Sequence, residues 1–519
     1  MNNRVVETTS GRVQGIDLDG VRAYRGVPFA SPPQGDLRFR PPQPVKPWSG
    51  IRAADRFADA AWQMPNPLMA SEAISDDCLY LNVWVPEGDG PFPVMVWIHG
   101  GSYTSGSPSQ VLYNGAELAR RNQVVVVNLS YRLGAWGYGW FRDLLPDLGE
   151  SGNLGLQDQL AGLRWVSDNI AGFAGDPGRV TVFGESAGGF SVATLMACPQ
   201  AQGLFQSAIV QSGAGDFVMS PAQASRVAQR VLDELPGSGS ALDRLLAADM
   251  KALVRAQNRA ARQVVERGLR ANTPQFGMTF MPVVDGDLLP RLPVDAVAAG
   301  ASRTVRLMAG VCRDEWNLFQ YAPPFNGNVP LETFRAMPRE EILRRLTRNL
   351  PGNGEAALAH YENEIEVHPR RGLMDYFSAM ETERTFTVPT VRLLDAQVGA
   401  GGQAWGFRFS HEIDSFGVPL GACHVSDVPF VFGLADTPAG RLFTGGGAPA
   451  VEIEGRVMAA WGAFAHGETP GWDDWASDRQ ANNFGGREAR VALLSASGER
   501  FWNGIIPAPG VGADKEAAS

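Results

Sequence analysis

The sequence predicts an α/β fold with a mostly parallel, doubly wound central sheet, covered by helices on both faces. One observation is a set of continuous apolar runs, such as residues 93–101 and 124–132. Strands that are covered on both faces have this pattern, whereas half-exposed strands alternate. A second observation is the order of segments in the middle of the chain, where a strand at 179–186 is followed by a helix at 187–197. Alternation of strand and helix favours parallel pairing.

The individual elements follow from local patterns. Strand-like runs come first, at residues 5–16, 21–30, 79–88, 93–101 and 124–132. A helix is expected over 153–175, where apolar residues recur at spacings of three and four until glycines end it; they are Leu156, Leu160, Leu163, Val166 and Ile170. Short strands return at 304–311 and 403–410, before a C-terminal helix around 456–468.

Two long segments carry helical patterns without strands. Residues 221–271 and 331–395 are polar and helical, and we interpret them as excursions from the sheet over the active site. No Pro/Ser-rich linker or long charge run divides the chain. We therefore expect one domain that spans residues 1–519.

Composition excludes several function classes. The chain has 519 residues, of which 44% are hydrophobic and 19% charged, as in a globular protein. Its net charge of −10, with no basic stripe, argues against nucleic acid as a partner. Neither a signal peptide nor an 18-residue apolar run is present, so we expect a cytoplasmic protein without a membrane partner. The four cysteines form no C-x-x-C pair, which argues against a zinc site and a disulfide framework; they are Cys78, Cys198, Cys312 and Cys423.

The segment 179–190, RVTVFGESAGGF, contains the pattern Gly-x-Ser-x-Gly. Gly184 and Gly188 allow a strand to reverse sharply into a helix, with Ser186 at the apex of the turn. This arrangement is typical of a nucleophile elbow.

A nucleophilic serine needs a base, and the base needs an acid to orient it. In doubly wound hydrolases the chain order is serine, acid, histidine. His424 lies late in the chain in a loop of small residues, and His411 follows a strand and is its main rival. Asp314 and Glu315 both follow the strand at 304–311, so either carboxylate is a candidate acid.

An acyl-transfer site also needs backbone NH groups that stabilise an oxyanion, at about 3 kcal/mol per donor. Gly100 and Gly101 follow the apolar strand 93–98 and have no Cβ to block a carbonyl oxygen. The NH group of Ala187 lies at the start of a helix, where the dipole favours negative charge.

Five blocks of the chain resemble the type-B carboxylesterase family, the α/β-hydrolases that include bacterial p-nitrobenzyl esterases and cholinesterases. The blocks are YRGVPFASPPQGDLRFRPP at 24–42, SDDCLYLNVWVP at 75–86, IHGGSYTSGS at 98–107, the serine segment at 152–191, and RDE at 313–315 with GACHVSDVPFVFG at 421–433. The resemblance implies an α/β-hydrolase fold.

By this resemblance Ser186 is the nucleophile, Glu315 the acid and His424 the base. It also implies an oxyanion hole made by the NH groups of Gly101, Ser102 and Ala187, and it places Glu185 at the site. Relatives commonly pair the cysteine that corresponds to Cys78 with an upstream one, but no cysteine precedes Cys78 here.

Aromatic residues near the motifs are candidates for the substrate pocket: Tyr103, Trp136, Phe217, Phe276, Trp316 and Phe319. We expect a serine carboxylesterase that hydrolyses a small-molecule ester through an acyl-enzyme, without metal or cofactor. Alternatives are a carbamate or aryl-amide hydrolase with the same triad and, more remotely, a non-catalytic interaction protein of the same fold. The sequence leaves open whether the protein is a monomer or a homo-oligomer.

Overall fold

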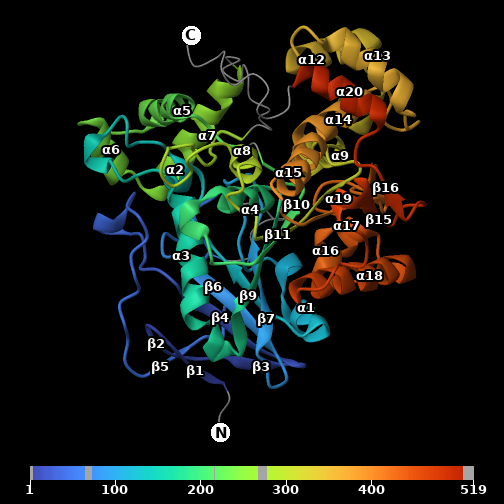
Figure 1. Ribbon diagram of the computed structural model, residues 1–519. Helices are drawn as coiled ribbons and strands as arrows, with labels where there is room; N and C mark the ends of the chain where they lie inside the picture. The colour runs from blue at the N-terminus through green and yellow to red at the C-terminus, as the bar shows by residue number, and fades with distance from the viewer. Residues whose placement is uncertain (1–3, 65–72, 216, 267–277, 507–519) are drawn as a thin grey trace.

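The computed structural model describes residues 4–64, 73–215, 217–266 and 278–506, and its central feature within them is an eleven-stranded sheet (Figure 1). The strands, in spatial order, are β16 (Arg490–Val491), β15 (Ala481–Phe484), β12 (Ala404–Phe409), β11 (Arg306–Cys312), β10 (Ser207–Gln211), β9 (Gly175–Glu185), β7 (Phe92–Ile98), β8 (Val125–Leu129), β6 (Tyr80–Pro86), β4 (Val21–Pro28) and β3 (Ile16–Leu18). Strands β15 to β8 are parallel, and both edges are antiparallel. The predicted sheet is confirmed.

The first strand-like run does not belong to this sheet. Residues 5–16 form a hairpin of β1 (Val5–Thr8) and β2 (Gly11–Gln14), which pairs with β5 (Ile51–Ala53). The Thr8 hydroxyl donates to the Gly11 carbonyl at 2.6 Å and closes the turn. A further small sheet contains β13 (Ile413–Ser415) and β14 (Val418–Gly421).

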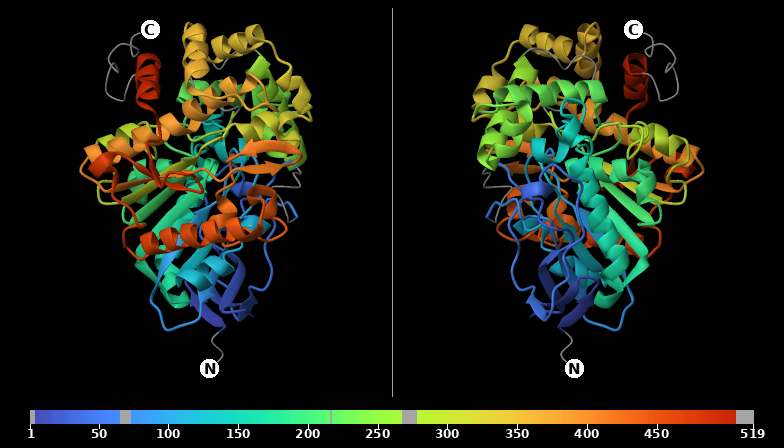
Figure 2. Two further views of the ribbon diagram at one scale, coloured as in Figure 1. Left: turned by 90° about the vertical axis from the view of Figure 1, so that its right-hand side faces the viewer. Right: turned by 90° about the vertical axis from the view of Figure 1, so that its left-hand side faces the viewer.

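Helices cover both faces of the central sheet. On one face lie α3 (Leu154–Asn169), α4 (Ala187–Ala197) and α15 (Val388–Gly399), and on the other α1 (Ala116–Asn122) and α18 (Gly447–Ala465). The two views of Figure 2 show α18 in front on one side and α3 in front on the other. Every residue of β7 and β8 is buried, which explains their continuous apolar sequence.

Both predicted excursions are helical. The first contains α5 (Pro221–Glu234), α6 (Ala241–Ala247) and α7 (Met250–Glu266), and its last five predicted residues lie outside the described ranges. Capping boxes at Ser220 and Ser240 start α5 and α6. The second contains α11 (Leu331–Arg335), α12 (Arg339–Asn349), α13 (Gly354–Glu364), α14 (Met374–Thr382), a π-helical turn η6 (Glu383–Thr387) and α15. Figure 1 shows both groups at the end of the molecule opposite the N-terminus.

The remaining helices are short. They are α2 (Gly134–Tyr138), α8 (Pro293–Ala298), α9 (Asn317–Tyr321), α10 (Pro323–Asn326), α16 (Val428–Val431), α17 (Arg441–Thr444), α19 (Trp475–Asp478) and α20 (Ala496–Ile505), with 3₁₀ turns η1 (Gly35–Leu37), η2 (Val111–Tyr113), η3 (Pro146–Leu148), η4 (Ile170–Phe173) and η5 (Pro199–Ala201).

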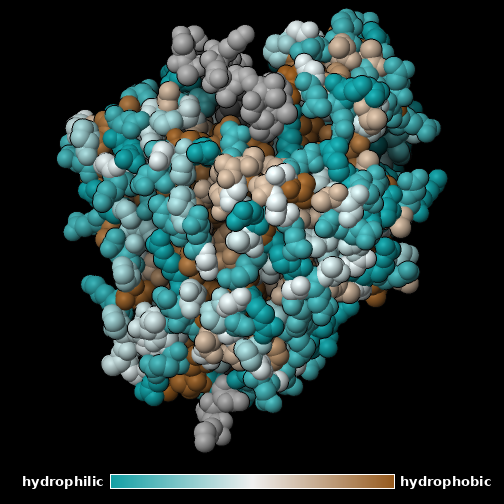
Figure 3. All heavy atoms as spheres, in the orientation of Figure 1, coloured by the Kyte–Doolittle hydropathy of each residue, from teal (hydrophilic) through white to brown (hydrophobic). Residues whose placement is uncertain are grey.

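Polar side chains cover most of the face drawn in Figure 3. The large apolar side chains exposed among the described residues are Ile51, Met64, Val111, Leu246, Leu292, Leu442 and Val451. No described helix has the length and apolar character needed to cross a membrane.

Candidate active site

The turn at Ser186 has the geometry expected of a nucleophile elbow. β9 ends at Glu185 and α4 begins at Ala187, and Ser186 between them has φ 56° and ψ −125°, which is rare for a residue with a side chain. A Cβ on Gly188 would lie 1.9 Å from the Ile98 carbonyl oxygen of β7. One on Gly184 would lie 2.6 Å from the backbone of Gly188. The elbow therefore requires both glycines.

Neighbouring parallel strands bring three segments together at this edge of the sheet. β9, β10 and β11 are adjacent, so their carboxyl ends, followed by Ser186, Ser212 and Glu315, lie side by side. The Ser186 NH donates to the Gln211 carbonyl at 3.0 Å, which joins the elbow to the end of β10.

His424 and Glu315 form a buried pair. The imidazole Nδ1 donates to Glu315 Oε2 at 2.6 Å. The other carboxylate oxygen accepts the Ser212 hydroxyl at 2.5 Å and the Cys312 NH at 2.7 Å. Glu315 is fully buried, so these three donors replace water around its charge. The Glu315 carboxylate is thereby fixed and holds the Nδ1 edge of the imidazole.

The second nitrogen of His424 faces the elbow. Nε2 lies 3.0 Å from Oε1 of Glu185, the residue before Ser186, yet it is buried without a hydrogen-bond partner among the described residues. Burial lowers the pKa of His424, but the charges of Glu185 and Glu315 outweigh burial and raise it above the usual histidine value. Burial raises the pKa of the Glu185 carboxyl. The imidazole thus lies between two carboxylates, with Nδ1 bonded to Glu315 and Nε2 in contact with Glu185 at the elbow.

Two of the neighbouring polar residues were not found from the sequence. Ser212 follows the strand 207–211, and its position at a strand end was the available signal. Asp427 lies three residues after His424 and accepts a hydrogen bond from Gln211 at 2.8 Å; burial raises the pKa of its carboxyl to about 6. Ser212 contacts Glu315 directly, and Asp427 joins the loop that carries His424 to the end of β10.

The glycine loop after β7 binds the Gly101 carbonyl within itself. The Gly101 oxygen accepts the NH groups of Thr104 and Ser105, each at 3.0 Å. Gly101 has φ 112° and Ser102 has φ 55°, so this tight turn lies in the left-handed region. A Cβ on Gly100 would lie 3.1 Å from the Ser186 Cβ, which places the loop directly beside the serine.

The rival residues lie in other surroundings. His411 Nε2 contacts the Thr444 carbonyl at 2.9 Å, and the His411 ring packs against Phe430. Asp314 points to Arg313 and to the Ala422 NH, at 2.7 Å and 2.8 Å. Glu315, by contrast, is the carboxylate that reaches His424.

The predicted aromatic residues lie in different surroundings, and one of them is outside the described residues. Phe319 lies 5.1 Å from the His424 ring, Trp316 lies 5.5 Å from Phe319, and Phe217 stacks on Phe190 at 4.2 Å. Tyr103 is fully buried, with its ring 4.8 Å from Tyr138. Trp136 is buried near the Arg132 guanidinium, and Phe276 lies outside the described residues. Phe386, which the sequence did not single out, lies 4.9 Å from the His424 ring.

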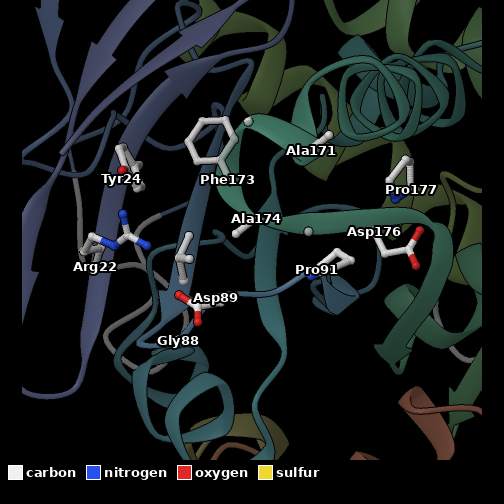
Figure 4. Close-up of a pocket in the computed structure, with 13 residues that line it drawn as sticks. Arg22, Tyr24, Gly88, Asp89, Pro91, Ala171, Phe173, Ala174, Asp176 and Pro177 are labelled. Atoms are coloured by element: carbon white, nitrogen blue, oxygen red, sulfur yellow. The ribbon is translucent and has the colours of Figure 1, made fainter. Parts of the chain in front are cut away.

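A cavity of about 690 Å³ lies away from these residues. Figure 4 shows Arg22 and Tyr24 of β4 on one side and Phe173 and Asp176 on the other. The cavity lining includes the first residues of β9, whereas Ser186 follows the last residue of that strand. The cavity therefore lies at the opposite end of β9 from Ser186.

Comparison with known proteins identifies the family. The carboxylesterase family matches residues 2–492. The chain belongs to the carboxylesterase family. This carboxylesterase is 35% identical to the para-nitrobenzyl esterase of Bacillus subtilis over 445 residues, which cover 84% of each chain. It is 34% identical to a cocaine esterase of Oryctolagus cuniculus over 95% of its length and 93% of the relative's. A mouse cholinesterase is 32% identical over 89% of this chain and 78% of the relative.

Solved structures agree with this assignment. A PNB esterase superimposes with a TM-score of 0.81 at 31% identity, over 97% of this carboxylesterase and 100% of that chain. A Geobacillus stearothermophilus carboxylesterase gives 0.80 at 34% identity, over 93% and 96%. The carboxylesterase therefore has the predicted α/β-hydrolase fold and is a carboxylic ester hydrolase.

Proposed function

We propose that this carboxylesterase hydrolyses esters through an acyl-enzyme, with Ser186 as nucleophile, His424 as base and Glu315 as acid. The observation that carries the proposal is the buried imidazole. Its Nδ1 is bonded to Glu315, and its Nε2 is turned toward the elbow, 3.0 Å from Oε1 of Glu185, the residue before Ser186. A base for a serine hydroxyl needs one nitrogen held by an acid and the other directed at the serine.

In the proposed reaction, Ser186 Oγ attacks the ester carbonyl carbon while His424 Nε2 takes the hydroxyl proton. Glu315 stabilises the imidazolium that forms. The proposed donors to the tetrahedral oxyanion are the NH groups at positions 101, 102 and 187; Ala187 directly follows the serine, and Gly100, which precedes the other two, lies beside it.

The imidazolium then gives its proton to the alkoxide oxygen, and the alcohol leaves as the bond between carbonyl carbon and alkoxide oxygen breaks. A water molecule attacks the acyl-Ser186 ester, and His424 takes a proton from this water. Breakdown of the second tetrahedral intermediate releases the carboxylic acid and restores the Ser186 hydroxyl. Because the three side chains come from positions 186, 315 and 424, we also propose that the chain acts as one catalytic domain.

The test is substitution of the serine and of the two histidines. Ser186→Ala should lower kcat on p-nitrophenyl acetate on the order of 10⁴-fold with an unchanged circular dichroism spectrum, and His424→Ala should match it. His411→Ala is the control and should retain most activity, because its ring contacts Phe430 and the Thr444 carbonyl instead. A Ser186→Ala variant that retains a tenth of wild-type turnover would contradict the proposal.

The same triad can act on carbamates or aryl amides. Turnover of an ester, a carbamate and an anilide that share one acyl group distinguishes these activities, and we expect the ester to be fastest. A faster carbamate or anilide would reassign the reaction to that bond.

A further inference from the structure

A π-helical turn interrupts the long helix of the second excursion. Residues Met374–Gly399 are helical throughout, but Glu383–Thr387 form a π turn between α14 and α15. Pro389 follows the turn; it has no NH to donate, and its ring would collide with the carbonyl of residue 385 in a regular α-helix. A wider turn relieves this conflict, and such turns are often found at functional sites.

The π turn carries Phe386 to His424. The Phe386 side chain is 1% exposed, and its ring centre lies 4.9 Å from that of the imidazole, at 39° between planes. Phe319 contacts the same imidazole at 5.1 Å and 48°. Among the described residues these are the aromatic rings that contact His424.

The turn is held in place by buried polar contacts. Arg384 donates to Glu381 at 2.6 Å, and both side chains are largely buried. The carboxylate of Glu383 accepts hydrogen bonds from Tyr361 of α13 and Trp502 of α20, both at 2.7 Å. Glu383 therefore anchors the turn that carries Phe386 to α13 and α20.

The same helix also contacts the acid loop. The hydroxyl of Thr382 accepts the NH of Trp316 at 3.0 Å, and Trp316 directly follows Glu315. One helical segment thus touches the histidine ring and the chain beside its carboxylate partner.

We propose that Phe386, delivered by the π turn, is a positioning residue that keeps the His424 imidazole directed at Ser186; this rests on the proposed function of His424 as the base. The contacts with Glu315 and Glu185 hold the two nitrogens, and the tilt of the ring is set by what packs on its faces, Phe386 and Phe319. A packed phenyl ring limits this tilt and keeps Nε2 at the elbow. Displacement of a reacting group by about 1 Å can reduce a rate as much as 10²-fold.

Phe386 also shields the imidazole from water. The charged groups around His424 are Glu185 at the end of β9, Glu315 after β11 and Asp427 in the histidine loop, whereas the π turn presents an uncharged ring. Burial lowers the pKa of His424, so removal of the ring should raise that pKa and move the acid limb of kcat/KM to higher pH.

The experiment compares Phe386→Leu with Phe377→Leu. Phe377 is buried on α14, in the same long helix, and is the matched control. For p-nitrophenyl acetate we expect Phe386→Leu to lower kcat about tenfold, with KM within about twofold, and to move the acid limb to higher pH. Phe377→Leu should lower the thermal midpoint of unfolding but leave kcat and the acid limb of kcat/KM at their wild-type values. Phe386→Tyr retains the ring and should keep most of kcat.

Wild-type kcat and pH profile in Phe386→Leu, or equal losses in Phe377→Leu, would overturn the proposal. If Phe386→Leu does not fold, Phe386→Met replaces it, because methionine fills the space with a flexible side chain that has no ring. The same changes in kcat and in the pH profile then support or overturn the proposal. The outcome is separate from the proposed function: activity in Ser186→Ala contradicts the triad, whereas an inactive Ser186→Ala with an unaffected Phe386→Leu removes only the positioning role.

Discussion

Two regions of the molecule differ in how much room they leave for a side chain. At the carboxyl ends of the central strands, a Cβ added to Gly184 or Gly188 would collide with backbone atoms, whereas in α18 a Cβ added to Gly455 would have no atom within 4 Å. The same contrast holds for charge. Arg132 and Asp158 pair without solvent exposure where α3 meets the end of β8, while Arg339 and Glu362 pair at the surface of the second excursion. At the carboxyl ends of the strands, close backbone contacts and buried charges therefore limit which residues are tolerated. In the surrounding helices, residue choice is limited mainly by which apolar face is buried.

The largest expected effect tests the glycine contrast. Gly188→Ala should abolish folding, because its Cβ would lie 1.9 Å from the Ile98 carbonyl and backbone atoms cannot move aside cheaply. Gly455→Ala is the control and should stabilise the protein by up to about 1 kcal/mol, since alanine is the better helix former. Yield of folded protein and chemical denaturation measure both. A folded, active Gly188→Ala would contradict the proposed tightness of the edge.

A second pair of variants tests the charge contrast. Asp158→Asn should cost about 3–5 kcal/mol of unfolding free energy, because the fully buried Arg132 loses its counter-charge. Glu362→Gln on the surface pair should leave the urea midpoint unchanged within error. Equal shifts in both variants would mean that burial does not separate the two regions.

The smallest expected effect is a shift in pH dependence. The charge of Glu185 raises the pKa of His424. As the proposed base, His424 must be neutral to accept a proton, so we expect activity to fall as pH decreases through that pKa. Glu185→Gln should therefore move the acid limb of kcat/KM to lower pH. Glu412→Gln removes an exposed carboxylate that pairs with Arg313 and should not move it. An acid limb that stays in place in Glu185→Gln would show that this charge does not act on His424.

The contrast between the two regions also explains what could be predicted from the sequence. The strands, the elbow and its glycines depend on local chemistry, so residues 179–197 alone indicate Ser186 at a strand-to-helix turn. From residue patterns alone, His411 and His424 both stayed candidates for the base. Asp314 and Glu315 likewise both stayed candidates for the acid, because the choice depends on where a loop points in space. The family resemblance was needed to choose between them.

Phe386 could not be predicted, for a related reason. The pattern of residues 374–399 predicts a helix, but the π turn changes which side chains share a face after it. Contact with His424 also depends on how the excursion packs on the sheet. The hairpin at 5–16 shows the same limit, since its pattern indicates strands and does not show that they form a separate sheet.

The spacing of the three central side chains along the chain has a consequence for synthesis. Ser186 is translated 238 residues before His424, and the histidine and its acid are 109 residues apart. At about 5–20 residues per second, the elbow is translated some tens of seconds before His424, its proposed base. With the proposed triad, the nascent chain exposes Ser186 without a base to activate it, and ester hydrolysis starts only after residue 424 has been translated and folded into place.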